Sequence, residues 1–270
     1  MTEQTSSPAV FLPDKLLSRL VAELDNETVR AIILRGSYAR GDAVPPYSDV
    51  DLTRVVQETA GHHQPKYYLW RDGYAISVST HSYAAYRERF TKPQEAIFVV
   101  TGVQEAIVLL DKDGEFRSFQ QEAKAFRWEP LQREANRYAG HMMMDQTEII
   151  LKLLRALRLH DMVLLSDVLT DLIPAMTEAF AVQRGILIYS GNTYFQQVQE
   201  IAGQQSAWTR YHRLAVGIDD DPTPSLEQRG IAALRLFQEA ARLLQPFLIA
   251  QHWDAIEPLQ SIIDRELAME

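Results

Sequence analysis

The stretch RGSYARGDAVPPYSDVDL, from Arg35 to Leu52, decides the fold of this 270-residue chain. A Gly36-Ser37 turn follows one apolar run, and Asp49 and Asp51 stand one residue apart in a second apolar run. Alternate residues of a β-strand point to the same face, so a strand over 49–56 would place the two carboxylates side by side. Because Asp is depleted in strand interiors and like charges repel, this pair indicates a cation between the carboxylates.

The chemistry of the two segments is complementary. Mg²⁺ usually binds one or two protein carboxylates and leaves the rest of its shell to water and substrate phosphates. A glycine turn lets backbone N–H groups approach a phosphate closely, and a helix that follows favours an anion. The Gly36-Ser37 turn and the Asp49/Asp51 pair therefore predict the two halves of a metal–nucleotide site. The alternative is a surface hairpin with two solvated aspartates.

The same residues resemble the signature of the nucleotidyltransferase superfamily of DNA polymerase β, in which Gly-Ser, a loop and Asp-x-Asp follow one another. The variant Gly-Ser-Tyr-Ala-Arg-Gly…Tyr-Ser-Asp-Val-Asp-Leu looks most like the minimal and the aminoglycoside nucleotidyltransferases. The resemblance implies an enzyme that transfers a nucleoside monophosphate from a nucleoside triphosphate, with ATP as the expected donor, to a hydroxyl of a small, aminoglycoside-like molecule. It also implies Mg²⁺ or Mn²⁺ at Asp49 and Asp51, which are the expected metal ligands and catalytic residues.

Four residues are expected to bind the nucleotide. On this interpretation Gly36 and Ser37 hold the terminal phosphates, Arg40 neutralises phosphate charge, and Ser48 bonds a phosphate. Two of them have an ordinary structural alternative. Arg40 is close enough in sequence to form a salt bridge with Asp42, and Ser48 is placed to cap the loop.

Active members of the superfamily usually add a third carboxylate from a neighbouring strand. The strand expected to supply it, residues 74–80, contains no acid, and Ser77 or Ser79 stands at that place. A hydroxyl can hold a metal-bound water but does not supply the charge that a second metal requires. A second interpretation therefore stays open, a catalytically weak nucleotide-binding protein or an antitoxin-like regulator.

The helical half offers candidates for the missing acid or base. The segment Glu134 to His141 resembles, around its Tyr-Ala-Gly, the segment that delivers a general base and a lysine in the aminoglycoside enzymes. Arg137 stands where that base is expected and His141 where the lysine is expected. His141 can act as a base near neutral pH, and His141 and Glu134 are the predicted catalytic residues of this half. If one unbroken helix carries Glu134 through Lys152, its polar face either lines a cleft or is solvated.

The order of the apolar patterns predicts the fold class. We expect an α/β (α+β) nucleotidyltransferase domain with a small mixed sheet over residues 1–125, followed by an all-α helical bundle over 126–270. The first part is predicted to contain strands at 29–34, 51–56, 66–71, 74–80 and 106–110, and helices at 13–24, 37–42, 83–90 and from Phe116. The second part is predicted to contain about five helices. There Trp208, Tyr211 and His212 either stack a substrate ring or pack helices together.

Composition restricts the partners. The formal net charge of −9 disfavours a nucleic-acid backbone as ligand, because such binding needs clustered Lys and Arg. No run of about eighteen apolar residues predicts a membrane span, and Met1 to Pro8 does not resemble a signal peptide. The chain has no Cys, so disulfides and thiolate metal sites are excluded. We expect a cytoplasmic monomer or homodimer whose partners are a nucleotide and a small-molecule acceptor.

Overall fold

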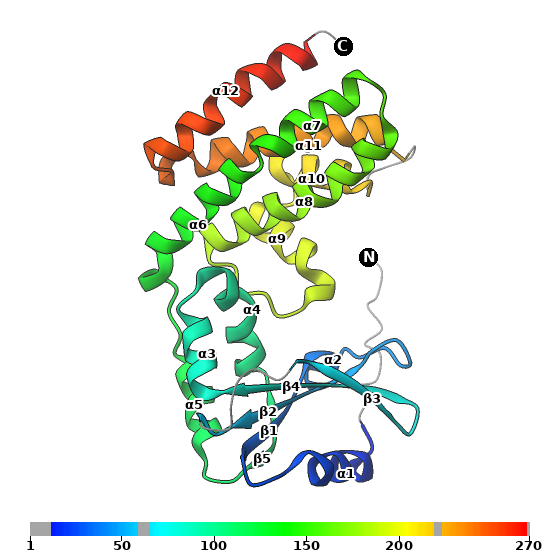
Figure 1. Cartoon of the computed structure of the whole chain (residues 1–270), viewed down its shortest axis with the longest axis vertical. Helices are drawn as coiled ribbons and strands as arrows, with labels where there is room; N and C mark the ends of the chain where they lie inside the picture. Colours follow the sequence, from blue (N-terminus) through cyan, green and yellow to red (C-terminus); the bar gives the residue numbers. More distant parts are fainter. Residues whose placement is uncertain (1–11, 59–64, 219–222, 269–270) are drawn as a thin grey trace. The chain divides into compact units, whose positions relative to one another are not determined.

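Two compact units make up the computed structural model of this chain, residues 1–127 and residues 128–270 (Figure 1). The structure describes residues 12–58, 65–218 and 223–268. The amino-terminal segment Met1 to Pro8, considered above as a leader, lies outside the described residues.

The first unit is built on a five-stranded mixed sheet. The strands are β1 (Val29–Arg35), β2 (Val50–Val56), β3 (Tyr67–Arg71), β4 (Tyr74–Ser82) and β5 (Ile107–Asp111), in the order β3-β4-β2-β1-β5. β2 and β4 are parallel, and the other neighbouring pairs are antiparallel. β3 and β4 are joined at Asp72-Gly73, where both residues have positive φ, as a two-residue hairpin turn requires. The predicted class, a small mixed sheet followed by an all-α part, is confirmed.

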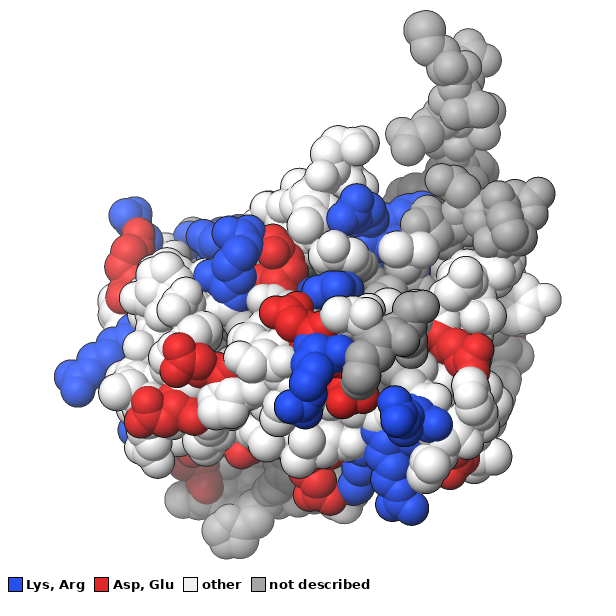
Figure 2. All heavy atoms as spheres, turned by 90° about the horizontal axis from the view of Figure 1, so that it is seen from above, with Lys and Arg blue, Asp and Glu red and all other residues white. Residues whose placement is uncertain are grey.

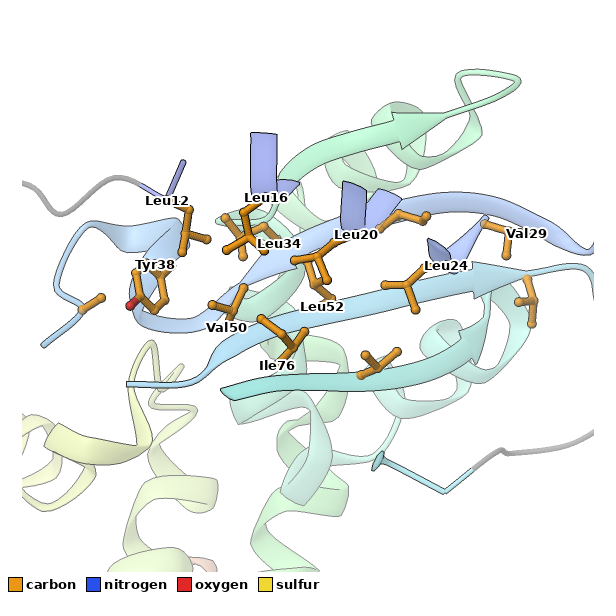
Figure 3. Close-up of a cluster of buried hydrophobic side chains, with 14 residues drawn as sticks. Leu12, Leu16, Leu20, Leu24, Val29, Leu34, Tyr38, Val50, Leu52 and Ile76 are labelled. Carbon is orange, nitrogen blue, oxygen red and sulfur yellow. The ribbon is translucent and has the colours of Figure 1, made fainter. Parts of the chain in front are cut away.

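The helix α1 (Asp14–Leu24) covers one face of this sheet. Its residues Leu16, Leu20 and Leu24 recur every fourth position, so they form one apolar stripe. Figure 3 shows this stripe against side chains of the strands, among them Val50 and Leu52 of β2. Because side chains alternate along a strand, burial of these two residues under α1 turns Asp51, the residue between them, to the opposite face.

The first unit also contains the short helix α2 (Gly36–Arg40) and the helices α3 (Tyr83–Phe90), α4 (Pro93–Gln104) and α5 (Glu115–Lys124). Aromatic rings join α3 to α5: the ring of Phe119 lies 5.3 Å from that of Phe90 and 5.7 Å from that of Tyr86. α4 is a helix that the sequence pattern did not predict. Most of its residues are buried, so it lacks a polar stripe, and its β-branched residues and Gly102 have weak helix propensity.

The second unit is all-helical in its described part. Its helices are α6 (Gln132–Asp145), α7 (Thr147–Arg158), α8 (Met162–Arg184), α9 (Tyr194–Ala202), α10 (Ala207–Val216), α11 (Leu226–Leu244) and α12 (Ala250–Leu267). Residues 128–218 and 223–268 contain seven α-helices, where about five were expected. α8, the longest, packs against α6, α7 and α11. None of the helices that the structure describes is both long and apolar enough to cross a membrane.

Charged side chains of both signs share the surface. On the face drawn in Figure 2, Lys and Arg side chains are interspersed with Asp and Glu side chains. Several opposite charges are direct partners, such as Lys152 with Glu148 at 2.7 Å and Arg242 with Glu239 at 2.7 Å. Opposite charges therefore offset one another locally in a chain whose net charge is −9.

The aromatic pair in α10 belongs to the packing of the helices. Trp208 and His212 are fully buried, and their rings stack 4.8 Å apart. The Gln199 side-chain amide donates to His212 Nδ1 at 2.9 Å, and His212 Nε2 lies 3.0 Å from Thr177 Oγ1. Since an amide nitrogen is only a donor, Nδ1 accepts and Nε2 carries the proton. His212 is thus neutral and fully hydrogen-bonded, which confirms the helix-packing interpretation.

This network makes the stability of the second unit pH-dependent. Burial lowers the pKa of His212 to about 4, below its value of about 6.5 in an unfolded chain. As the pH falls, the unfolded chain therefore binds a proton at His212 before the folded chain does. The stability contributed by neutral His212 is present above pH 6.5 and lost as the pH falls toward 4.

We expect the unfolding free energy to fall by about 2 kcal/mol between pH 7 and pH 5 because of His212. Urea denaturation at both pH values should show a smaller loss for His212→Gln. The exposed His160→Gln is the matched control, and an equal loss in all three proteins would contradict the assignment.

Candidate functional site

A row of four residues crosses the sheet at the start of β2. Arg35 of β1 lies opposite Asp51 of β2, Asp51 is in register with Ser77 of β4, and Ser77 lies opposite Tyr68 of β3. Residues in register on neighbouring strands share a face of the sheet. This face is the one opposite α1, because Leu52, the neighbour of Asp51, is buried under α1. One cation, one carboxylate, one hydroxyl and one aromatic ring therefore stand side by side.

The Asp51 carboxylate has close polar neighbours. The Ser77 hydroxyl donates to Asp51 Oδ1 at 2.6 Å, and the Lys66 ammonium lies 3.5 Å from the same oxygen. Ser77 is buried, whereas the Asp51 side chain is 31% exposed. The carboxylate is thus held in one orientation and still open to a ligand from solvent.

Gly36 brings the turn after β1 against this carboxylate. Its φ is +68°, a conformation that glycine adopts without strain. A Cβ at this position would overlap Asp51 Oδ2. The backbone of the turn therefore contacts the carboxylate directly, so the two segments that the sequence singled out are adjacent in the folded chain.

Asp49 precedes β2 rather than lying within it. The strand begins at Val50, between the two starts considered from the sequence, residues 49 and 51. Asp49 therefore occupies the end of the loop, in a half-buried position. Burial lowers the pKa of Lys66, but Tyr68 and the negative charges of Asp51 and Asp49 outweigh this effect and raise it overall. Both aspartates therefore act on the same ammonium group.

The donor set suits a single hard cation. Two carboxylates from nearby positions, with a glycine turn against one of them, fit the usual magnesium arrangement of one or two protein carboxylates. Among residues 12–58, 65–218 and 223–268, no group of three or more His, Cys, Asp or Glu side chains is placed to hold a metal. A larger all-protein cage is thus absent from the described part of the chain.

The other predicted nucleotide-binding residues lie in α2 (Gly36–Arg40), except Ser48, which lies in the loop before β2. Ser37 is half-buried, and its carbonyl oxygen accepts from the backbone N–H groups of Gly41 and Asp42. Arg40 donates to Asp42 at 3.2 Å, the salt bridge considered above as its alternative. The Ser48 hydroxyl accepts from the Val44 N–H at 2.8 Å, which is loop-capping geometry.

A cavity of about 580 Å³ opens on the Asp51 face of the first unit. It is lined from the sheet side and from α3, α4 and the loop between them, by Arg35, Asp51, Leu52, Thr53, Lys66, Ser79, His81, Ala85, Glu88, Arg89, Lys92 and Glu95. Its volume lies within the usual range for small-molecule sites, roughly 300–1,000 Å³. The cavity thus provides room beside Asp51 for a ligand of nucleotide size.

The charges in this cavity fall into two groups. Near α3, Arg89 and Lys92 are paired with acids: Arg89 lies 2.6 Å from Glu95, and Lys92 lies 2.7 Å from Glu88. Near the sheet, Arg35 donates to the Tyr86 hydroxyl at 3.3 Å. Neither Lys66 nor these arginines was predicted from the sequence, because no local motif marks them. They meet only through the pairing of strands and the packing of α3.

The strand expected to carry a third acid carries a hydroxyl instead. Ser77 is in register with Asp51 and bonds to it, and Ser79 is in register with Thr53, with the two hydroxyl oxygens 2.7 Å apart. The position beside Asp51 on β4 is thus occupied by a buried hydroxyl.

Glu134 and His141 belong to α6 of the second unit. Glu134 lies 3.8 Å from Arg137, and Arg137 donates to His141 Nε2 at 3.5 Å. The His141 ring is 4.6 Å from that of His252 on α12. Burial, together with the charges of His141 and Arg137, lowers the pKa of His252. Within its unit, His141 therefore belongs to a cluster of basic groups that packs α6 on α12.

The condition of one unbroken helix from Glu134 to Lys152 does not hold. α6 ends at Asp145 and α7 begins at Thr147. Gln146 has ψ of 0°, outside the regular helical range, and the Thr147 hydroxyl donates to the Met144 carbonyl oxygen at 2.7 Å. The polar positions on either side of this break therefore do not form one continuous helical face.

Comparison with known proteins gives little beyond this geometry. No family model matches the chain, and no curated protein matches it. Among solved structures, it is similar to the crystal structure of a nucleotidyltransferase-like protein from Exiguobacterium sibiricum 255-15. The identity is 13%, the match covers 86% of this chain and 73% of the other, and the TM-score is 0.43. A similarity this low establishes neither a family nor a function.

The contact between Gly36 and Asp51 gives a test with a control inside the same unit. Gly36 and Gly73 both have positive φ, but a Cβ at Gly73 meets nothing within 4 Å. Both alanine substitutions carry the left-handed backbone cost of about 1–2 kcal/mol. Only Gly36→Ala must also displace the Asp51 carboxylate, so we expect it to lower the unfolding free energy by a further 1–3 kcal/mol, roughly the cost of overpacking. Equal losses in urea denaturation would show that the contact does not constrain the turn.

Proposed function

We propose that this chain is a Mg²⁺-dependent nucleotidyltransferase that transfers a nucleoside monophosphate from ATP to a hydroxyl of a small molecule. The observation that carries the proposal is the contact of the Gly36 turn with the Asp51 carboxylate, with Asp49 close by in sequence. A glycine turn against a carboxylate, with a second carboxylate close by in sequence, suits a metal-bound triphosphate. The adjoining cavity supports the proposal because it offers space for the rest of the nucleotide.

Each part of the site has a proposed role. Asp49 and Asp51 would hold the metal ion, and the backbone of Gly36 and Ser37 would hold the terminal phosphates. Mg²⁺, when bound, neutralises phosphate charge and orients the phosphate oxygens. Arg40 and Ser48 would exchange their partners, Asp42 and Val44, to contact phosphate. Arg35 faces the cavity beside Asp51 and adds positive charge there.

The reaction requires one bond to form and one to break. The acceptor hydroxyl oxygen bonds to the α-phosphorus, and the bond from that phosphorus to the bridging oxygen of the leaving pyrophosphate breaks. The hydroxyl proton passes to a general base. An acceptor with cationic or neutral groups suits a chain of net charge −9 through long-range attraction.

A second function is favoured by one specific observation. The buried Ser77 stands beside Asp51, at the position where active members of the superfamily that the sequence resembles carry an acid. Without that acid the site would bind a metal–nucleotide complex but transfer the nucleoside monophosphate slowly or not at all. The chain would then be a nucleotide-binding or antitoxin-like regulatory protein.

The binding step is tested by removing the two carboxylates. Calorimetric titration of ATP with Mg²⁺ should show a loss of about 2–4 kcal/mol of binding free energy in Asp49→Asn/Asp51→Asn, the scale of charge-assisted contacts. A matched control is Asp25→Asn/Asp113→Asn, which removes the same charge from the same unit at residues that pair with Lys112 and Arg30. ATP binding that is independent of Mg²⁺, or equal in the two double variants, would contradict the proposal.

The transfer step separates the two functions. The wild-type protein is supplied with α-labelled ATP, Mg²⁺ and a panel of aminoglycosides, nucleosides and short RNA. Transfer to a small hydroxylated molecule supports the enzyme, and transfer to RNA alone contradicts a small-molecule acceptor. Binding of ATP without any transfer favours the regulatory function.

A further inference from the structure

An ammonium group already stands beside the candidate metal site. Lys66 lies just before β3, and its Nζ is 3.5 Å from Asp51 Oδ1 and 5.1 Å from the centre of the Tyr68 ring. A carboxylate on one side and an aromatic face on the other both attract a cation. The Lys66 side chain is 46% exposed, so packing alone does not fix its position. Attraction to the carboxylate and the ring holds the ammonium there.

The two oxygens of Asp51 have different surroundings. Oδ1 accepts from the Ser77 hydroxyl and lies next to Lys66, whereas Oδ2 points to Gly36. The proposed phosphate position is on the Gly36 side. A divalent ion that bridges phosphate and Asp51 would therefore use the side of the carboxylate that Lys66 leaves open.

The charge of the site limits how many metal ions it can hold. A second divalent ion needs further anionic ligands, and the neighbouring strand supplies the hydroxyl of Ser77 in place of a carboxylate. An ammonium needs no such ligands: it adds one positive charge beside Asp51 and is oriented by its own chain. Lys66 thus adds positive charge beside Asp51 without the further carboxylate that a second divalent ion would need.

We propose that Lys66 supplies the second cation of this site, so that Asp49 and Asp51 hold one divalent ion and the Lys66 ammonium occupies the place of another. The inference rests on the proposed function, because it assigns a role to Lys66 toward the same metal–nucleotide site. Lys66 acts through Asp51 and is a positioning residue. It links the Asp51 carboxylate of β2 to the β3 edge, where Tyr68 is 61% exposed.

The test measures Mn²⁺ binding without nucleotide, from the free Mn²⁺ signal in electron paramagnetic resonance. Lys66→Met removes the competing charge, so we expect Mn²⁺ to bind at least about fivefold more tightly than in wild type, the effect of a unit charge near 4 Å even in water. Lys66→Arg retains the charge and should resemble wild type. The matched control is Lys112→Met, which removes a lysine paired with Asp25 at 2.6 Å in the same unit and should leave Mn²⁺ affinity unchanged. Lys66→Gln serves as a second variant if the Met variant does not fold.

A second measurement counts the metal ions. With a saturating non-hydrolysable ATP analogue, wild type should retain one protein-bound Mn²⁺ per chain, and the gain in Lys66→Met should vanish when Asp49→Asn/Asp51→Asn is added. Equal Mn²⁺ affinity in wild type and Lys66→Met, no binding in either, or two ions in wild type would overturn the inference. ATP binding is recorded on the same samples. If Mg²⁺-dependent ATP binding persists, only the role of Lys66 fails, and if wild type binds no ATP, the proposed function fails as well.

Discussion

The contact between the Gly36 backbone and the Asp51 carboxylate is the constraint on which the candidate site depends. It exists because Gly36 adopts a left-handed φ and carries no Cβ, so the chain leaving β1 passes directly over the carboxylate of β2. Any larger residue at this position separates the turn from the carboxylate. The antiparallel pairing that sets Arg35 opposite Asp51 holds both ends of this contact in register.

The apolar core decides which way the carboxylate faces. The leucines of α1 bury Val50 and Leu52 of β2, and strand alternation then turns Asp51 to the other face. On that face the sheet is covered by α3 and α4, and the cavity lies between them and the strands. Burial of apolar side chains on one face of the sheet thus fixes the polar side chains on the other face. The unit can therefore be stable while its charged site stays open to a ligand.

Much of the first unit was predictable because its signals are local. The apolar stripe of α1, the Asp72-Gly73 turn and the Gly-Ser…Asp-x-Asp spacing each lie in one short stretch of sequence. A two-residue hairpin turn even sets Tyr68 opposite Ser77 in advance. The position of Lys66 was not predictable, because it also requires the parallel pairing of β4 with β2. α4 was missed since a helix buried on most sides has no polar stripe. The break between α6 and α7 at Gln146 was not predictable either, because it depends on local backbone geometry and the spacing of apolar residues does not reveal it.

The central claim is that the Gly36 turn and the Asp49/Asp51 pair form one metal–nucleotide site. The most direct measurement is a crystal structure with a non-hydrolysable ATP analogue and Mn²⁺, with anomalous diffraction to locate the metal. We expect one Mn²⁺ peak about 2 Å from an oxygen of each aspartate, with the triphosphate against the Gly36-Ser37 backbone. A triphosphate bound elsewhere, or a metal coordinated away from Asp51, would contradict the claim.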